Sequence, residues 1–127
     1  MSKTILLVDN DKKTINENTE LLKQHGYTVK SVETAKEALE EVSKSKPDAV
    51  VTEVMLEQAD AGFGLCYHLK QKYPEMPVLI LSGVVRQKEI NFGVNTQEQR
   101  VWIKADEFID KPVRPETVVC MLSRYLG

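Results

Sequence analysis

The sequence lacks the residue patterns that mark several protein classes. Its 127 residues include only two cysteines, Cys66 and Cys120, which lie far apart and form no CxxC motif, so neither a disulfide framework nor a zinc site is supported. We expect both to be buried free thiols. No run approaches the roughly 18 to 20 apolar residues of a membrane helix, and no signal-peptide pattern follows Met1. A cytoplasmic protein is therefore expected.

An excess of charge of one sign is also missing. The chain has 17 basic and 19 acidic residues, which argues against a nucleic-acid-binding surface built on bulk positive charge. Aromatic residues make up only 6%, yet hydrophobic residues reach 42%, which is enough for one packed core. With no repeat, low-complexity tract or linker, residues 1–127 are predicted to form one domain without an output domain. No direct contact with nucleic acid or a membrane is expected.

Short apolar runs alternate along the chain with longer segments of helical period. We predict strands at 4–8, 27–32, 49–52, 78–81 and 107–110. This alternation predicts a parallel sheet with helices on both faces. The first, third and fourth runs are continuously apolar and suit the sheet interior, whereas the mixed second and fifth runs suit its edges. We predict a flavodoxin-like, doubly wound α/β fold with five parallel strands in the order 2-1-3-4-5.

Five helices are expected to flank this sheet. We predict them at 11–25, 34–42, 62–73, 96–104 and from Pro115 onwards. Gly26 suits a left-handed helix end, Thr34 and Glu37 form a capping box, and Pro115 suits a first helical position. The polar, poorly periodic stretch 84–104 predicts an elongated connection after the fourth strand.

Polar residues follow the apolar runs at the points where strands should end. They are Asp9, Asn10 and Asp11 after the first run, Glu53 after the third, Ser82 after the fourth and Lys111 after the fifth. Ligands of open α/β sheets bind outside the carboxyl ends of the strands, so these side chains are expected to converge. The carboxylates suit Mg2+, which prefers oxygen ligands, and the amine and hydroxyl suit phosphate oxygens.

Three segments, 5–11, 47–53 and 105–113, with Ser82 between the last two, resemble the receiver domain of two-component response regulators. The resemblance spans essentially the whole chain. It implies a Mg2+ site, a phosphoacceptor, two groups that bind the phosphoryl oxygens and an aromatic switch residue. By position, these roles fall on Asp9, Asn10, Glu53 and the Met55 carbonyl for the metal, Glu53 for the acceptor, Ser82 and Lys111 for the phosphoryl group, and Phe108 for the switch.

Two positions depart from the family pattern, which has aspartate at the acceptor position and a second acid next to Asp9. Glu53 carries its carboxylate one methylene further out, and a displacement on the order of 1 Å can cost roughly 100-fold in rate. Asn10 contributes a neutral oxygen where the family has a charge, so Mg2+ should bind weakly. These departures predict a receiver without ordinary aspartate phosphorylation.

The resemblance therefore implies a stand-alone, atypical receiver that signals by binding a histidine kinase or a downstream effector. A homodimer through the fourth helix, the fifth strand and the last helix is the other expected contact. Glu53 could reach toward Lys111 and Ser82 as a partial mimic of the phosphorylated state, or form a purely structural ion pair with Lys111. Phosphorylation of Glu53 itself and a Mg2+-dependent phosphoryl-transfer enzyme with Asp9 as nucleophile are the alternatives. An enzyme is not expected, and a flavodoxin-type cofactor site lacks its phosphate-binding loop.

Overall fold

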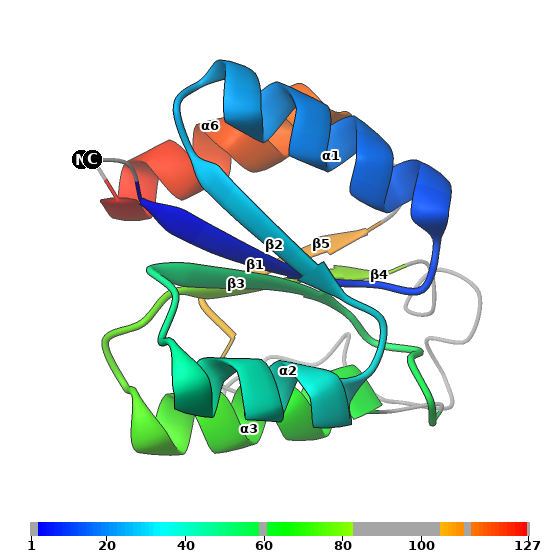
Figure 1. Ribbon diagram of the computed structural model, residues 1–127, viewed down its shortest axis with the longest axis vertical. Helices are drawn as coiled ribbons and strands as arrows, with labels where there is room; N and C mark the ends of the chain where they lie inside the picture. Colours follow the sequence, from blue (N-terminus) through cyan, green and yellow to red (C-terminus); the bar gives the residue numbers. More distant parts are fainter. Residues whose placement is uncertain (1–2, 59–60, 83–104, 111–112, 127) are drawn as a thin grey trace.

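The structure is a computed structural model that describes residues 3–58, 61–82, 105–110 and 113–126 (Figure 1). The strands are β1 (Thr4–Val8), β2 (Thr28–Val32), β3 (Ala49–Glu53), β4 (Val78–Ser82) and β5 (Glu107–Asp110). The helices are α1 (Lys12–Gln24), α2 (Ala35–Lys44), α3 (Ala61–Lys72) and α6 (Pro115–Leu126). The predicted helix at 96–104 and the elongated connection around it lie outside the described residues.

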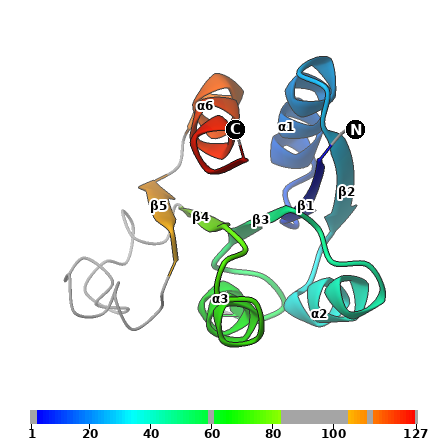
Figure 2. The same cartoon turned by 90° about the vertical axis from the view of Figure 1, so that its left-hand side faces the viewer.

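The five strands form one parallel sheet in the order β2-β1-β3-β4-β5. Helices α1 and α6 lie on one face of the sheet, and α2 and α3 lie on the other (Figure 2). Every residue of β3 is buried, whereas β2 at the edge is largely exposed, as the apolar pattern predicted. The predicted fold class and strand order are therefore confirmed.

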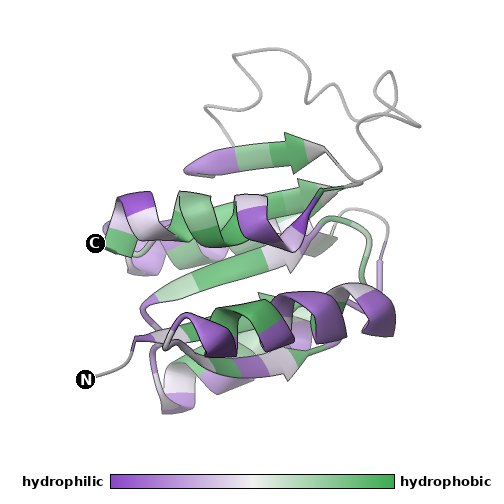
Figure 3. Cartoon of the chain, turned by 90° about the horizontal axis from the view of Figure 1, so that it is seen from above, coloured by the Kyte–Doolittle hydropathy of each residue, from purple (hydrophilic) through white to green (hydrophobic). Residues whose placement is uncertain are grey.

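Successive residues of each strand supply two separate apolar layers, because side chains alternate across a sheet. Leu6, Val50 and Ile80 belong to the layer beneath α2 and α3, while Leu7 and Val51 belong to the layer beneath α1 and α6. The apolar colouring of the central strands in Figure 3 reflects this burial on both faces. The sheet is thus covered by apolar packing on both faces, and the polar residues lie at the carboxyl ends of its strands.

The helix ends follow the predicted chemistry with one difference. Gly26 has φ +90°, which favours glycine, and it follows the α1 C-cap. Thr34 accepts a hydrogen bond from the Glu37 N–H (3.0 Å), as expected of a capping box. The Glu37 carboxylate, however, accepts from the N–H of Glu33 (3.1 Å) rather than from that of Thr34. The hydrogen bond from the backbone to the Glu37 carboxylate therefore comes from Glu33, the residue before the expected donor Thr34.

The expectation that both cysteines are buried was wrong. Cys66 is buried, but Cys120 is exposed on α6, because the buried face of that helix is formed by Val118, Val119 and Leu122. Tyr125 of the same helix is also exposed, and its hydroxyl donates to Glu107 (2.6 Å). None of the helices in the described part of the chain has the length and apolar character needed to cross a bilayer.

Candidate functional site at the carboxyl ends of the strands

Asp9 follows β1 directly and lies at the carboxyl end of the sheet. The parallel register places Val8 beside Thr52, so Asp9 comes beside Glu53, the last residue of the neighbouring strand β3. Asp9 is only 6% exposed, and its Oδ1 accepts a hydrogen bond from the backbone N–H of Asp11 (2.9 Å). Asn10 beside it is exposed. The two positions predicted to hold the metal after β1 thus carry one buried carboxylate and one exposed amide.

Glu53 ends β3 and is 8% exposed. Its Oε2 accepts hydrogen bonds from the backbone N–H groups of Val54 (2.5 Å) and Met55 (3.3 Å). The additional methylene of glutamate allows this side chain to fold back over its own loop. Because hydrogen bonds from N–H groups to a carboxylate are charge-assisted, they hold the side chain in this position. The prediction that Glu53 reaches toward Ser82 and Lys111 stays open, since the Ser82 side chain and Lys111 lie outside the described residues.

Gly62 fixes the backbone beneath Glu53. Its N–H donates to the Val54 carbonyl (2.8 Å), and a Cβ at this position would overlap the carbonyl oxygen of Glu53. The Thr52 hydroxyl donates to the same carbonyl (3.0 Å). Because only glycine allows the start of α3 to approach so closely, this contact sets where the acceptor-position residue lies.

A second glutamate of the loop after β3, Glu57, joins the site to another element. Its two carboxylate oxygens accept hydrogen bonds from the N–H groups of Ala35 (2.7 Å) and Lys36 (3.0 Å) in the first turn of α2. A carboxylate is favoured there because the first N–H groups of a helix have no partner within the helix. Burial alone raises the pKa of Glu57, but the hydrogen bonds from Ala35 and Lys36 outweigh it and lower the pKa. This contact was not predicted from the sequence.

Phe108, the predicted switch residue, is half-buried in β5. Its ring stacks on that of Phe63 in α3, with 5.9 Å between centroids and 28° between planes. It packs against the apolar layer beneath α2 and α3. A Phe at this position leaves no hydroxyl to satisfy, so burial suits it. Its role as a switch stays a prediction.

The oxygen donors at this edge fit a hard divalent cation that is only partly held by protein. The carboxylates of Asp9 and Glu53, the Asn10 side-chain oxygen and the Met55 carbonyl would hold Mg2+, which commonly keeps several waters and binds through one or two carboxylates. The described part of the chain contains no group of three or more His, Cys, Asp or Glu residues placed to bind a metal.

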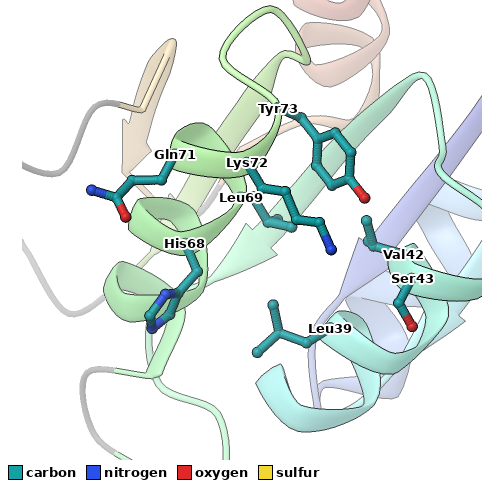
Figure 4. A pocket seen from close by; sticks show the side chains of 8 residues that line it. All are labelled: Leu39, Val42, Ser43, His68, Leu69, Gln71, Lys72 and Tyr73. Carbon is teal, nitrogen blue, oxygen red and sulfur yellow. The ribbon is translucent and has the colours of Figure 1, made fainter.

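A larger hollow of about 500 Å3 lies between α2 and α3, away from this edge (Figure 4). Its wall includes apolar residues of both helices, among them Leu39 and Leu69, together with Lys72 and Tyr73. The ammonium groups of Lys46 and Lys72 lie 5.7 and 5.6 Å from the centre of the Tyr73 ring. None of the described residues that line it carries a carboxylate, unlike the strand ends.

A family model described as the response regulator receiver domain matches residues 5–123. The chain belongs to this family. The receiver domain is 34% identical to the regulatory protein VanR of Enterococcus faecium over 127 residues, which cover 99% of this chain and 51% of VanR. The domain thus spans about half the length of that relative. The expectation that no output domain accompanies it stays a prediction.

Solved structures agree with this assignment. The non-phosphorylated HemR receiver domain of Leptospira biflexa is 26% identical, with a TM-score of 0.80 over 99% of this chain and 95% of that one. The chemotaxis response regulator CheY4 of Vibrio cholerae is 22% identical, with a TM-score of 0.82 over 99% and 100% of the two chains, and it supports the fold alone. Receiver domains are signalling domains that interact with histidine kinases and effectors and typically bind Mg2+ at the phosphorylation site.

Proposed function

We propose that this receiver domain acts in two-component signal transduction by binding a partner protein, without ordinary aspartate phosphorylation. The observation that carries the proposal is the position of the Glu53 carboxylate. It is largely buried and accepts hydrogen bonds from the N–H groups of Val54 and Met55. A nucleophilic oxygen held in this way is displaced from where an aspartate would present it, and such misplacement lowers the rate strongly.

The same geometry supports a permanent partial mimic of the phosphorylated state. A phosphoryl group on an acceptor residue has three oxygens that need hydrogen-bond donors, and the backbone N–H groups that follow the acceptor are the nearest ones. The Glu53 carboxylate already engages two such N–H groups. The mimic carries one negative charge, whereas a phosphoryl group carries nearly two. We infer that Glu53 replaces a cycling phosphoryl group in setting the conformation of the loop after β3.

The proposed partners are a histidine kinase or a downstream effector. A second copy of the domain, docking through the surface that includes β5 and α6, is the alternative partner. Mg2+ is proposed to bind weakly through Asp9, Asn10, Glu53 and the Met55 carbonyl, since Asn10 removes one negative charge from the family's ligand set. Replacement of Asn10 by aspartate should tighten Mg2+ binding, measured by titration calorimetry.

Phosphorylation with a small donor tests the proposal. The native protein, Glu53→Asp and Glu57→Asp would each be incubated with acetyl phosphate and Mg2+, and their intact masses measured. We expect the mass of one phosphoryl group to be gained by Glu53→Asp alone, because aspartate returns the nucleophile to its usual reach. Glu57→Asp is the matched control, since it makes the same change in the same loop.

A stoichiometric, acid-labile adduct on native Glu53 would overturn the proposal and favour phosphorylation of the glutamate itself. An adduct on Asp9, located by peptide mass analysis, would favour the alternative phosphoryl-transfer enzyme. If Glu53→Asp gains nothing while its circular dichroism matches that of the native protein, the idea of an otherwise retained acceptor site is wrong.

A further inference from the structure

Asn18 is a polar side chain on the buried face of α1. It is 5% exposed, and its Nδ2 donates to the Thr14 carbonyl one turn earlier (2.9 Å). No group among the described residues donates to its Oδ1, which is fully buried. Buried polar atoms in folded proteins nearly always have a hydrogen-bond partner, and one that lacks a protein partner commonly binds an internal water.

A small cavity lies next to Asn18, between α1 and the carboxyl ends of the central strands. Its polar lining comprises Asp9, Thr14, Asn18, Thr52 and Glu53, and the remainder is apolar. The space inside it that can hold water has a volume of about 10 Å3. That is the space required by a single water molecule, and it is too small for a hydrated ion.

The chemistry of the lining also limits which species can occupy the cavity. Asn18 Oδ1 is an acceptor, and the carboxylates of Asp9 and Glu53 are acceptors as well, so an anion would be repelled. A dehydrated divalent cation needs six or more oxygen ligands in most protein sites, which a space of this size does not arrange. Water can donate two hydrogen bonds at once and so satisfies both kinds of acceptor.

We propose that this cavity binds one buried water molecule, which donates one hydrogen to Asn18 Oδ1 and the other to the Glu53 carboxylate. A carboxylate offers about four acceptor positions, so this bond adds to those from Val54 and Met55. Asn18 is then a positioning residue, because it links α1 through the water to the residue at the acceptor position. The proposal does not depend on whether Glu53 is phosphorylated.

A crystal structure of the native domain, at a resolution that shows ordered waters, tests the binding site. We expect one water peak at about 2.7 to 3.2 Å from Asn18 Oδ1. An empty cavity, or an Asn18 side chain rotated onto a protein donor, would overturn the proposal. This measurement requires no variant and no phosphodonor, so its outcome is independent of the test of function.

The link to Glu53 is tested in solution by Asn18→Leu, which removes the acceptor and displaces the water. Because Glu53 accepts from Val54 and Met55, their amide resonances should shift in the variant, measured by two-dimensional 1H–15N NMR. Asn16→Leu is the matched control on the exposed side of α1 and should leave both resonances in place. If Asn18→Leu does not fold, Asn18→Ala removes the same acceptor without added bulk. Unchanged Val54 and Met55 resonances in a folded Asn18 variant would show that the water does not reach Glu53.

Discussion

Glu53 and Glu57 lie in one short stretch of the chain, each accepts two backbone hydrogen bonds, and yet they act on different parts of the molecule. Glu53 is buried and bonds to the two residues that directly follow it. Glu57 is exposed and bonds to Ala35, 22 residues earlier, and to Lys36. The first contact is local and holds the Glu53 carboxylate at the carboxyl ends of the strands. The second joins the loop after β3 to the start of α2.

The difference shows that the partners of a carboxylate decide what it contributes. A contact between adjacent residues closes almost no loop and adds little to the fold as a whole. A contact between residues far apart in the sequence forms only when the tertiary structure brings them together, so its loss should lower the stability of that structure. Glu53 is accordingly a candidate for signalling, whereas Glu57 is a candidate for holding the loop in place.

The largest expected effect comes from the backbone contact that supports Glu53. Gly62→Ala introduces a Cβ that overlaps the Glu53 carbonyl oxygen, so α3 and the end of β3 must separate. We expect the free energy of unfolding to fall by about 3 kcal/mol or more, measured by urea denaturation.

Gly64→Ala is the matched control for this substitution. A Cβ at Gly64, on the exposed side of the same helix, meets no atom within 4 Å. Alanine is the better helix former, so this variant should gain up to about 1 kcal/mol. If the two variants were equally stable, the close approach at Gly62 would not limit the structure.

A smaller loss is expected when the second contact is weakened. Glu57→Gln removes the charge at the start of α2 and replaces one acceptor oxygen with a donor. We expect a loss of about 1 kcal/mol in urea denaturation at low salt, since exposed contacts of this kind are screened. Glu40→Gln changes the same charge on the exposed side of α2 and should have little effect. Equal losses in the two variants would indicate a general charge effect instead of a specific contact.

The stabilisation from Glu57 should also depend on pH in a defined direction. Its pKa in the folded protein lies below the ordinary value of 4.5. A carboxyl group with a lowered pKa stabilises the folded state fully above its unfolded pKa, and this contribution is lost as the pH falls through the folded pKa. The difference in stability between native protein and Glu57→Gln should therefore be constant near neutral pH and shrink below about pH 4.5. A difference that grew on acidification would contradict the assignment.

The smallest expected effect is on the reactivity of the Cys66 thiol. It distinguishes the backbone contact between Gly62 and Glu53 from the contact between Glu57 and α2. Burial raises the pKa of Cys66 to about 12, the nearby charge of Asp106 adds to the rise, and Lys70 opposes it. With Cys120 exposed, a disulfide reagent should label one thiol quickly and Cys66 slowly. In a Cys120→Ser background, Gly62→Ala should accelerate labelling of Cys66, while Glu57→Gln should not. Acceleration by both would mean that the two contacts stabilise one common unit.

Strand positions and the order of the sheet could be predicted from the sequence because apolar runs and turn residues encode them locally. The contact of Glu57 could not, since it depends on the tertiary placement of α2 beside the loop. The fold-back of Glu53 depends on a side-chain rotamer, which spacing does not specify. The burial of Asn18 could have been predicted, because helical spacing from Ile15 and Leu22 places it on the apolar face of α1. The exposure of Cys120 shows that a residue's usual burial is no guide at a single position.

The parallel sheet also has a practical consequence for measurement. Since all strands run in one direction, Thr4 and Leu126 lie at the edge opposite to Asp9 and Glu53 (Figure 1). Strands of this length span about 17 Å. A fluorophore attached near either residue therefore stands clear of the acidic edge. Paired with a second dye at the exposed Met55, it would act as a ruler along the strands, and movement of the loop would be read as a change in energy transfer.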